Sequence, residues 1–275
     1  MTQTLTLFSP AKVNLFLRVL SRRPDGYHNI ASLFQTIDLG DILHFTLSEE
    51  DRLTCQDSTI KCDETNLISR AVELFRQKTA LKFKVQIHLE KSIPLQAGLG
   101  GGSSNAATTL WALNVLNGRI ASPEDLKEWS SEIGSDIPFF FSQGTAYCTG
   151  RGERIQNLPS LPFSKTYSLV KPEESLSTPL IYKSLDLNTT SPHDPEDLLD
   201  RFYSGDPCYI NDLEVPSFRL CPSLKRLKHQ LLSLGCQNIF MTGSGTGLIC
   251  EGGEKQGIPL RLITRSAGSW YTIEV

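Results

Sequence analysis

The sequence has 275 residues, with 27 lysines and arginines against 30 aspartates and glutamates and a formal net charge of −3. A charge balance of this kind provides no basic surface for nucleic acid or for an anionic membrane. The length suits one large domain or two smaller lobes around a shared cleft, and we expect two lobes.

Cysteine usage and apolar runs bear on the compartment. The seven cysteines are scattered and contain no C-x-x-C pair, which is typical of reduced thiols rather than of zinc ligands or disulfides. The densest apolar run, Ile137 to Phe141, is too short to cross a bilayer, and the chain does not open on a basic segment followed by an apolar core. We therefore expect a cytoplasmic protein without a membrane or nucleic-acid partner, and the sequence leaves its oligomeric state open.

Hydrophobic periodicity predicts a hairpin at the start of the chain. Residues 13–19 alternate between apolar and more polar side chains, a turn cluster occupies 22–26, and a second strand-like stretch covers 27–39. Apolar residues at helical spacing then predict a helix over 66–78, and strict alternation predicts a strand over 83–89.

A glycine-rich loop at 98–102 follows, and the apolar residues after it predict a helix through Asn114. Ser122 is a typical cap for a further helix, because a proline and two acidic residues come directly after it. We expect Gly134 to close that helix.

The composition changes near Leu158. Residues 171–222 are rich in proline, serine and aspartate and carry only short apolar clusters. We therefore place the lobe boundary here, with an N-terminal lobe at 1–158 and a C-terminal lobe at 159–275.

Regular patterns return at the end of this segment. A leucine periodicity predicts a helix over 224–234 that Gly235 stops, and a short strand is expected at 239–241. A second glycine loop at 242–247 precedes another apolar stretch. Strands and helices mix in both halves without a steady parallel alternation, which favours an α+β fold over a doubly wound one.

The string GLGGGSS at 98–104 indicates a phosphate site. Its glycines leave room for a backbone to approach an anion, and the following helix offers oriented N–H groups and the positive end of its dipole. The string has no lysine after the last glycine and lacks the G-x-G-x-x-G spacing, so it is neither a Walker loop nor a dinucleotide fingerprint. The alternative is a flexible surface turn.

Single residues are ambiguous from local sequence alone. Asp136 precedes the apolar run, where a partly desolvated carboxylate can accept a proton, but a helix cap is an equal alternative. Lys12 on the first strand can stabilise phosphoryl charge or be a solvated edge charge. Tyr27 fits an ordinary strand, and His28 lacks the spaced partners of a metal ligand.

Four segments together resemble the GHMP kinase superfamily: SPAKVNLFLRVLSRRPDGYHNIASLFQTIDLGD at 9–41, PLQAGLGGGSSNAATTLWALN at 94–114, GSDIPFF at 134–140 and MTGSGTG at 241–247. The combination of AK-N, DGYH and GLGGGSSNAA is similar to the branch of that family whose substrate is a cytidine diphosphate-linked methylerythritol. The resemblance covers most of the chain and is poorest over 184–207.

The resemblance implies a two-lobed GHMP kinase fold with the active site in the cleft between lobes. It implies transfer of the γ-phosphoryl group of ATP to the substrate's 2-hydroxyl, in the non-mevalonate route to isoprenoid precursors. Asp136 would be the catalytic base and Lys12 its electrostatic partner. Tyr27 and Tyr182 would sandwich the cytosine, with a tyrosine at 182 where the family often has phenylalanine, while His28 reads the base's polar edge and Asn14 holds the polyol or its phosphates.

The resemblance also implies an ATP site, in which Gly100 to Ser104 hold the β- and γ-phosphates. For Lys91, a plain solvated charge is an equal alternative. Magnesium is expected with ATP; Ser104 is a possible ligand, and no carboxylate partner can be named. The expected nucleotide-binding residues are Asn66, Leu67, Lys91, Pro94, Leu95, Gln96, Ala97, Gly98, Leu99, Gly100, Gly101, Gly102, Ser103 and Ser104.

Two other functions compete with this interpretation. A GHMP kinase acting on mevalonate, homoserine or a sugar would not require the aromatic residues Tyr27 and Tyr182. A non-catalytic phosphate-sensing or nucleic-acid-binding module would need a basic stripe or a missing catalytic pair, and the sequence has neither.

Overall fold

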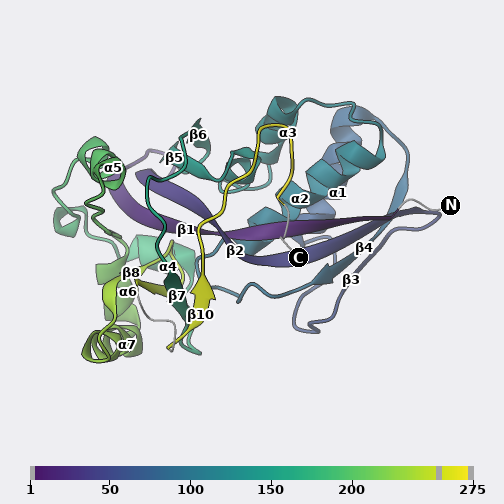
Figure 1. The fold of residues 1–275 in the computed structure, drawn as a ribbon. Helices are drawn as coiled ribbons and strands as arrows, with labels where there is room; N and C mark the ends of the chain where they lie inside the picture. Colours follow the sequence, from purple (N-terminus) through teal and green to yellow (C-terminus); the bar gives the residue numbers. More distant parts are fainter. Residues whose placement is uncertain (1–3, 252–255, 272–275) are drawn as a thin grey trace.

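The computed structural model describes residues 4–251 and 256–271, which form two sheets with helices packed against them (Figure 1). The first sheet has six strands in the order β3-β4-β2-β5-β6, and β1 pairs with β2. Its strands are β1 (Thr4–Arg22), β2 (His28–Ser48), β3 (Arg52–Cys55), β4 (Lys84–Glu90), β5 (Thr145–Gly150) and β6 (Arg154–Asn157). The expected α+β architecture is confirmed.

The predicted opening hairpin is also confirmed, although its strands are longer than the sequence indicated. Strands β1 and β2 have 19 and 21 residues and pair antiparallel along almost their whole length. The register shifts three times, first between Pro10 and Lys12 and next between Asn14 and Phe16. Such bulges take backbone groups out of the ladder and re-aim side chains, and they are common beside functional sites.

Four helical segments lie in the same half of the molecule as the first sheet: α1 (Leu67–Thr79), α2 (Gly101–Leu116), α3 (Pro123–Ser130) and the 3₁₀ turn η1 (Pro138–Phe141). In Figure 1 the three α-helices lie on one side of the long hairpin, and a large apolar core fills the space beneath them. Ser122 caps α3 as predicted, in a full capping box with Asp125. The expected end at Gly134 is wrong, because α3 stops at Ser130 and a series of turns leads on to η1.

The second sheet has four strands in the order β10-β7-β9-β8. They are β7 (Tyr167–Val170), β8 (Gln237–Met241), β9 (Leu248–Glu251) and β10 (Ile258–Leu260). The helical segments of this half are α4 (Thr178–Lys183), η2 (Leu187–Thr189), α5 (Pro195–Ser204), α6 (Glu214–Leu220) and α7 (Pro222–Ser233). The helix, strand and glycine loop predicted after residue 222 are all present. Short helices occupy the proline-rich segment before it, and two of them, η2 and α5, have side-chain caps at Asp186 and Asp194.

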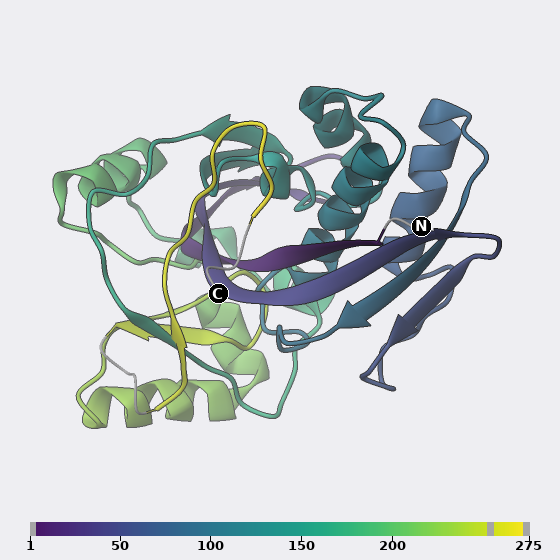
Figure 2. The same ribbon diagram turned by 45° about the vertical axis from the view of Figure 1, so that its right-hand side comes forward.

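The two halves are joined by more than a linker. A second apolar core contains side chains from both sheets, among them Phe16 and Phe240. After β10 the chain runs back to the first sheet, where Ile37 and Leu262 form a β-bridge and Trp270 stacks on Trp111 at 5.1 Å (Figure 2). The cleft between the halves therefore has firmly packed walls.

Among the described residues, no helix is both long and apolar enough to span a bilayer. All seven cysteines are free thiols, as the sequence predicted.

Candidate functional site

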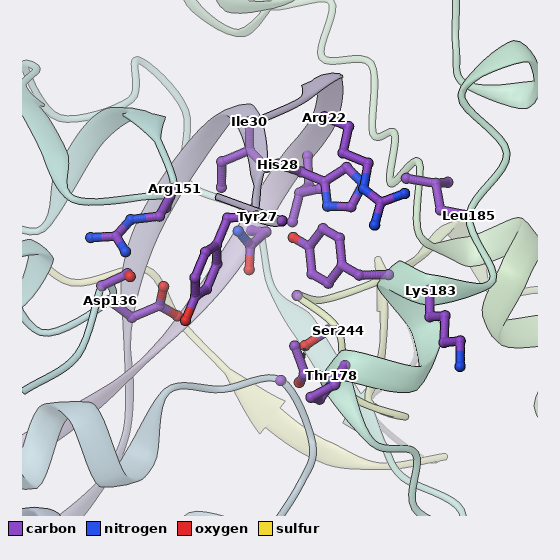
Figure 3. Close-up of a pocket in the computed structure, with 18 of the residues that line it drawn as sticks. Arg22, Tyr27, His28, Ile30, Asp136, Arg151, Thr178, Lys183, Leu185 and Ser244 are labelled. Atoms are coloured by element: carbon purple, nitrogen blue, oxygen red, sulfur yellow. Dashed lines mark hydrogen bonds between the residues drawn. The ribbon is translucent and has the colours of Figure 1, made fainter. Parts of the chain in front are cut away.

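A cavity of about 1020 Å³ opens between the two halves of the molecule (Figure 3). Its walls come from the β1–β2 hairpin, the first glycine loop, the turn before η1, the β5–β6 turn, α4 with the segment after it, and the second glycine loop. Six of the residues expected to bind substrate or to act in catalysis line this one cavity: Lys12, Asn14, Tyr27, His28, Asp136 and Tyr182.

The bulge after Pro10 explains the position of Lys12. It frees the Lys12 backbone N–H, which donates to the Leu99 carbonyl at 2.9 Å and so ties β1 to the first glycine loop. The Lys12 side chain is only 3% exposed, and its ammonium lies 4.7 Å from the centre of the Phe34 ring. Burial lowers the pKa of Lys12 below its ordinary value, and the nearby Asp136 carboxylate partly opposes that shift.

Lys12 and Asp136 face each other, although they are far apart in the sequence. Lys12 Nζ lies 3.7 Å from Asp136 Oδ2 and donates a 2.6 Å hydrogen bond to Asn14 Oδ1. The Asn14 amide in turn donates to Ser32 Oγ at 2.8 Å, which fixes its orientation. The ammonium is therefore held from two sides at the edge of the cavity.

The chain around Asp136 keeps its carboxylate at the water boundary. Asp136 is 38% exposed, while the next residues, Ile137 to Phe141, are buried. Phe139 packs edge-to-face on Phe34 at 5.1 Å, and Phe34 is the ring under Lys12. The aromatic pair thus supports both charged groups, and an acid next to a buried cation can accept a proton from a bound hydroxyl.

The two glycine loops touch each other through their backbones. A Cβ atom at Gly98 would lie 2.0 Å from the Thr242 carbonyl oxygen, and one at Gly245 would lie 2.0 Å from Gly98 N. Gly98 and Gly243 also have positive φ angles, of 79° and 57°. Only glycine fits these positions. The second loop is therefore both a hairpin turn between β8 and β9 and a close neighbour of the first loop.

The first loop presents the start of α2 to the cavity. Helix α2 begins at Gly101, inside the glycine run rather than after it, and its N-cap Gly100 has no side-chain hydrogen bond. The first turn contains no acidic residue. The free N–H groups and the positive helix end therefore suit an anion such as a phosphate.

A smaller cavity of about 150 Å³ lies on the other side of this loop. Most of the expected nucleotide-binding residues line it: Lys91, Pro94, Leu95, Gln96, Ala97, Gly98, Leu99, Gly100, Gly101 and Gly102. Gly98 and Gly100 line both cavities. The loop backbone therefore separates the small cavity from the large one and can contact ligands in each.

The other expected nucleotide-binding residues lie near this loop but line neither cavity. Asn66 caps α1, where its amide accepts from Ile68 N at 2.9 Å and donates to the Lys61 carbonyl at 2.7 Å. Leu67 approaches the loop, since its side chain lies 3.4 Å from the Cβ position of Gly102.

Lys91 is not a solvated charge, so that alternative is wrong. Its side chain is 8% exposed and pairs with the fully buried Asp41, with Nζ 3.0 Å from Oδ2. Asp41 also accepts hydrogen bonds from the backbone of Ser92 and Ile93 and from the Asn105 amide. This network connects β2, the entry to the loop and α2.

The described part of the chain offers no ready metal site. The Ser104 hydroxyl is fully buried and receives a hydrogen bond from Ser9 Oγ at 2.8 Å, and Ser104 lines neither cavity. Ser103 follows the same glycines in the first turn of α2. Within residues 4–251 and 256–271, no group of three histidine, cysteine, aspartate or glutamate side chains is placed to hold a metal ion.

Three of the expected substrate-binding residues carry rings that line the large cavity: Tyr27, His28 and Tyr182. His28 stacks on Tyr182 with ring centres 5.1 Å apart, whereas Tyr27 is 57% exposed and lies against the Arg151 guanidinium. Burial and the charge of Arg22 lower the pKa of His28, so its imidazole is neutral near pH 7. Burial and the Asp136 charge raise the pKa of Tyr182, so its phenol is neutral too. These uncharged rings suit an uncharged heterocycle.

Sequence reasoning missed several residues of the cavity and its support. Arg151 and Arg22 line the cavity, and only the glycines on both sides of Arg151 marked that position as a tight turn. No local sequence pattern indicates the role of Asn211. Its amide donates to the carbonyls of Met241 and Gly243 at 2.7 and 2.8 Å, and so it fixes the second glycine loop.

The substitution Asn211→Ala should therefore destabilise the protein by about 1–3 kcal/mol, because two buried carbonyls lose their donor. Urea unfolding measures this change, and Asn117→Ala is a control that removes a partly exposed amide near the end of α2. Equal stabilities of the two variants would show that the second loop does not depend on Asn211.

Comparison with known proteins gives close relatives. Residues 66–144 match the GHMP kinases N terminal domain. The chain is 48% identical over 274 residues to a 4-diphosphocytidyl-2-C-methyl-D-erythritol kinase from Protochlamydia amoebophila, covering 98% of this chain and 93% of the relative. It is 46% identical to the chloroplastic enzyme of that name from Arabidopsis thaliana, covering 97% of this chain and 76% of the relative.

Solved structures give the same picture of the fold. A crystal structure of 4-(cytidine 5'-diphospho)-2C-methyl-D-erythritol kinase superposes with a TM-score of 0.80 at 32% identity, over 95% of this chain and all of that one. A homoserine kinase from Cytophaga hutchinsonii reaches a TM-score of 0.70 at 17% identity, over 92% of this chain and 86% of that one. The second likeness concerns the fold alone.

Proposed function

Because the chain belongs to the GHMP kinase family and, within it, to the 4-diphosphocytidyl-2-C-methyl-D-erythritol kinases, we propose that Asp136 and Lys12 are the catalytic pair of that reaction. The enzyme uses ATP to phosphorylate the 2-hydroxyl of 4-diphosphocytidyl-2-C-methyl-D-erythritol, a step in the non-mevalonate pathway to isoprenoid precursors. The observation that carries the assignment of residues is the 3.7 Å approach of Lys12 to Asp136 at the edge of the shared cavity.

The reaction follows from the positions of these two groups. Asp136 accepts the proton of the substrate hydroxyl, and the hydroxyl oxygen attacks the γ-phosphorus as the bond to the β–γ bridging oxygen of ATP breaks. ADP leaves with the electron pair of that bond. Lys12 keeps Asp136 ionised and stabilises the charge on the transferred phosphoryl group, and its burial strengthens both effects.

The first glycine loop holds the phosphates of ATP between the two cavities. Its N–H groups at the start of α2 bind the β- and γ-phosphates, while the adenosine lies toward the smaller cavity. Lys91 supports the loop through Asp41 and borders that cavity, and Asn66 and Leu67 lie next to it. Ser103 and Ser104 belong to the first turn of α2.

Magnesium is expected as the counter-ion that ATP brings. The residues that the structure describes do not form a metal site, since the Ser104 hydroxyl is buried against Ser9 and no cluster of acidic, histidine or cysteine side chains is placed to bind an ion. The proposed mechanism therefore assigns no step to the ion.

The aromatic side chains of the cavity, Tyr27, His28 and Tyr182, bind the cytidine. We place the cytosine between Tyr27 and the His28–Tyr182 stack, because an exposed ring on one side and a stacked pair on the other can hold a flat heterocycle. The neutral His28 can exchange hydrogen bonds with the polar edge of the base. Asn14, already fixed by Ser32, lies where the polyol reaches Lys12.

The other kinase functions are not favoured. Mevalonate and homoserine kinases share the fold at 13% and 17% identity, whereas the relatives at 46–48% carry the name of the cytidine-dependent enzyme. The seven free cysteines suit a cytoplasmic enzyme, although the plant relatives are chloroplastic.

A substrate panel tests this function. Wild-type protein with ATP should produce ADP with 4-diphosphocytidyl-2-C-methyl-D-erythritol and not with mevalonate, homoserine or galactose.

In the same assay Tyr182→Ala should raise the KM for the cytidine substrate roughly 5- to 150-fold, the equivalent of about 1–3 kcal/mol for a base–aromatic stack. Tyr182→Phe should stay close to wild type, because it keeps the ring.

The matched control is Tyr203→Ala, since Tyr203 bonds the Pro159 carbonyl outside the cavity. Turnover of a substrate without a nucleobase would refute the proposed specificity. An unchanged KM in Tyr182→Ala would refute the cytidine position while leaving the kinase activity in place.

A further inference from the structure

The turn between β5 and β6 brings Arg151 to the wall of the large cavity. Gly150 and Gly152 have φ angles of 71° and 113°, and the Arg151 N–H donates to the Glu153 carboxylate at 2.6 Å. The turn also touches the proposed base, since a Cβ atom at Gly152 would lie 3.3 Å from Asp136 Oδ1. The backbone of Arg151 is thus fixed beside the reacting centre.

Among the described residues no carboxylate lies close enough to pair with the Arg151 guanidinium, although its charge is felt at Asp25, where it helps to lower the pKa. The guanidinium carbon of Arg151 lies 5.1 Å from the centre of the Tyr27 ring. Its Nε is buried without any hydrogen-bond partner among residues 4–251 and 256–271, and no carboxylate in that part of the chain forms an ion pair with it. A buried donor without an acceptor is costly, so its presence beside a cavity points to a ligand that supplies the acceptor.

The neighbouring carboxylates are engaged elsewhere. Asp25 pairs with Arg23 at 3.0 Å and accepts from the Tyr27 backbone, and Glu153 accepts from the Arg151 backbone. Asp136 pairs with Lys12. The acceptor for Arg151 is therefore best supplied from the cavity.

The cavity gives this cation a defined place along the substrate. Figure 3 shows Arg151, Tyr27 and Asp136 on one side of the cavity; across from them lie Arg22, beside His28, and Lys183 on α4. The diphosphate joins the cytidine to the polyol, and the turn that carries Arg151 borders both Tyr27 and Asp136, so we expect the diphosphate to lie within reach of Arg151. Lys12, the other cation on this side, is held by Asn14 and Asp136.

Building on the proposed function, we propose that Arg151 binds the diphosphate of the cytidine substrate with one edge of its guanidinium while its face supports the Tyr27 ring. Arginine suits this double role, because its planar fork matches phosphate oxygens and its face stacks on aromatic rings. The residue is then a determinant of specificity for a nucleoside diphosphate rather than for a nucleoside.

Inhibition by cytidine, CMP and CDP tests this role. Arg151→Met should leave the inhibition constant of cytidine within about two-fold of wild type and raise that of CDP roughly 10- to 100-fold, the range of a charge-assisted hydrogen bond. The KM for the cytidine substrate should rise by the same factor, with kcat and the KM for ATP nearly unchanged. Arg151→Lys should fall between Arg151→Met and wild type, because it keeps the charge and loses the fork.

Arg154→Met is the matched control, since Arg154 is an exposed arginine on β6 that does not line the cavity. Equal losses for cytidine and CDP in Arg151→Met would overturn the proposal in favour of support for Tyr27 alone, and unchanged constants would overturn it outright. Calorimetric titration with CDP and cytidine measures their dissociation constants without any turnover. It therefore separates a failure of Arg151 from a failure of the proposed kinase activity.

Discussion

Replacing Asp136 by asparagine should lower kcat about 10²- to 10⁴-fold, the usual contribution of a positioned base. Asparagine keeps the size and the hydrogen-bonding oxygen of the side chain but cannot take up the proton of the substrate hydroxyl. The KM values for ATP and the cytidine substrate should change little, because the substitution alters neither the glycine loop nor the aromatic side chains that line the cavity. Steady-state ADP formation at saturating substrates measures the effect.

Asp51→Asn is a close control for this change. Asp51 is 37% exposed against 38% for Asp136, and it also pairs with a lysine, Lys84 at 3.0 Å. It lies outside the cavity, so its loss should leave kcat unchanged. A kcat for Asp136→Asn within a few-fold of wild type would mean that Asp136 does not act as the base.

The sequence predicted the parts of the fold in which one face of an element is buried. The helix at 66–78 and the strand at 83–89 have clear periods, and the structure places α1 and β4 within a residue or two of those bounds. The sequence underestimated the lengths of β1 and β2, because both faces of these strands are buried around polar residues such as Ser9 and Asn14. A buried polar residue breaks the alternation that reveals a strand.

Helix α5 in the proline-rich segment could have been recognised from its cap. Asp194 caps α5 with a proline at the first position, the same signal that located α3 at Ser122. The apolar face of α5 consists of only two buried residues, Leu198 and Phe202. Periodicity over so few residues does not separate a helix from a loop.

The candidate site depends on contacts that no local pattern contains. Lys12 and Asp136 are brought together by the sheet, the η1 turn and the Phe34–Phe139 pair, so only the family resemblance linked them beforehand. The resemblance did not indicate Arg151 or the role of Asn211, because their importance lies in a missing partner and in carbonyls of a distant loop. Those features exist only in three dimensions.

Replacing Lys12 by methionine should lower kcat about 10²- to 10³-fold, because a fixed charge is lost where negative charge develops. Methionine retains much of the buried length, so the Phe34 contact and the fold should survive. Lys84→Met, which removes an exposed lysine paired with Asp51, is the control and should have little effect.

The pH dependence of kcat/KM, which reports the pKa values of the free enzyme, distinguishes this charge effect from a packing defect. Burial lowers the pKa of Lys12, so the wild-type enzyme should lose activity on the alkaline side at a pH below the ordinary lysine value, as the ammonium loses its proton. The methionine variant has no proton to lose there, and its profile should lack that descent. A descent that persists in Lys12→Met would assign it to another group.

The double variant Lys12→Met with Asp136→Asn gives the sharpest test of the pair. If Lys12 acts partly by keeping Asp136 ionised, removing the lysine from an enzyme that already lacks the carboxylate should cost much less than removing it from wild type. Steady-state kcat values of the four proteins give this coupling directly. Losses that simply multiply would mean that the two groups act independently, and the 3.7 Å contact between them would then have no part in catalysis.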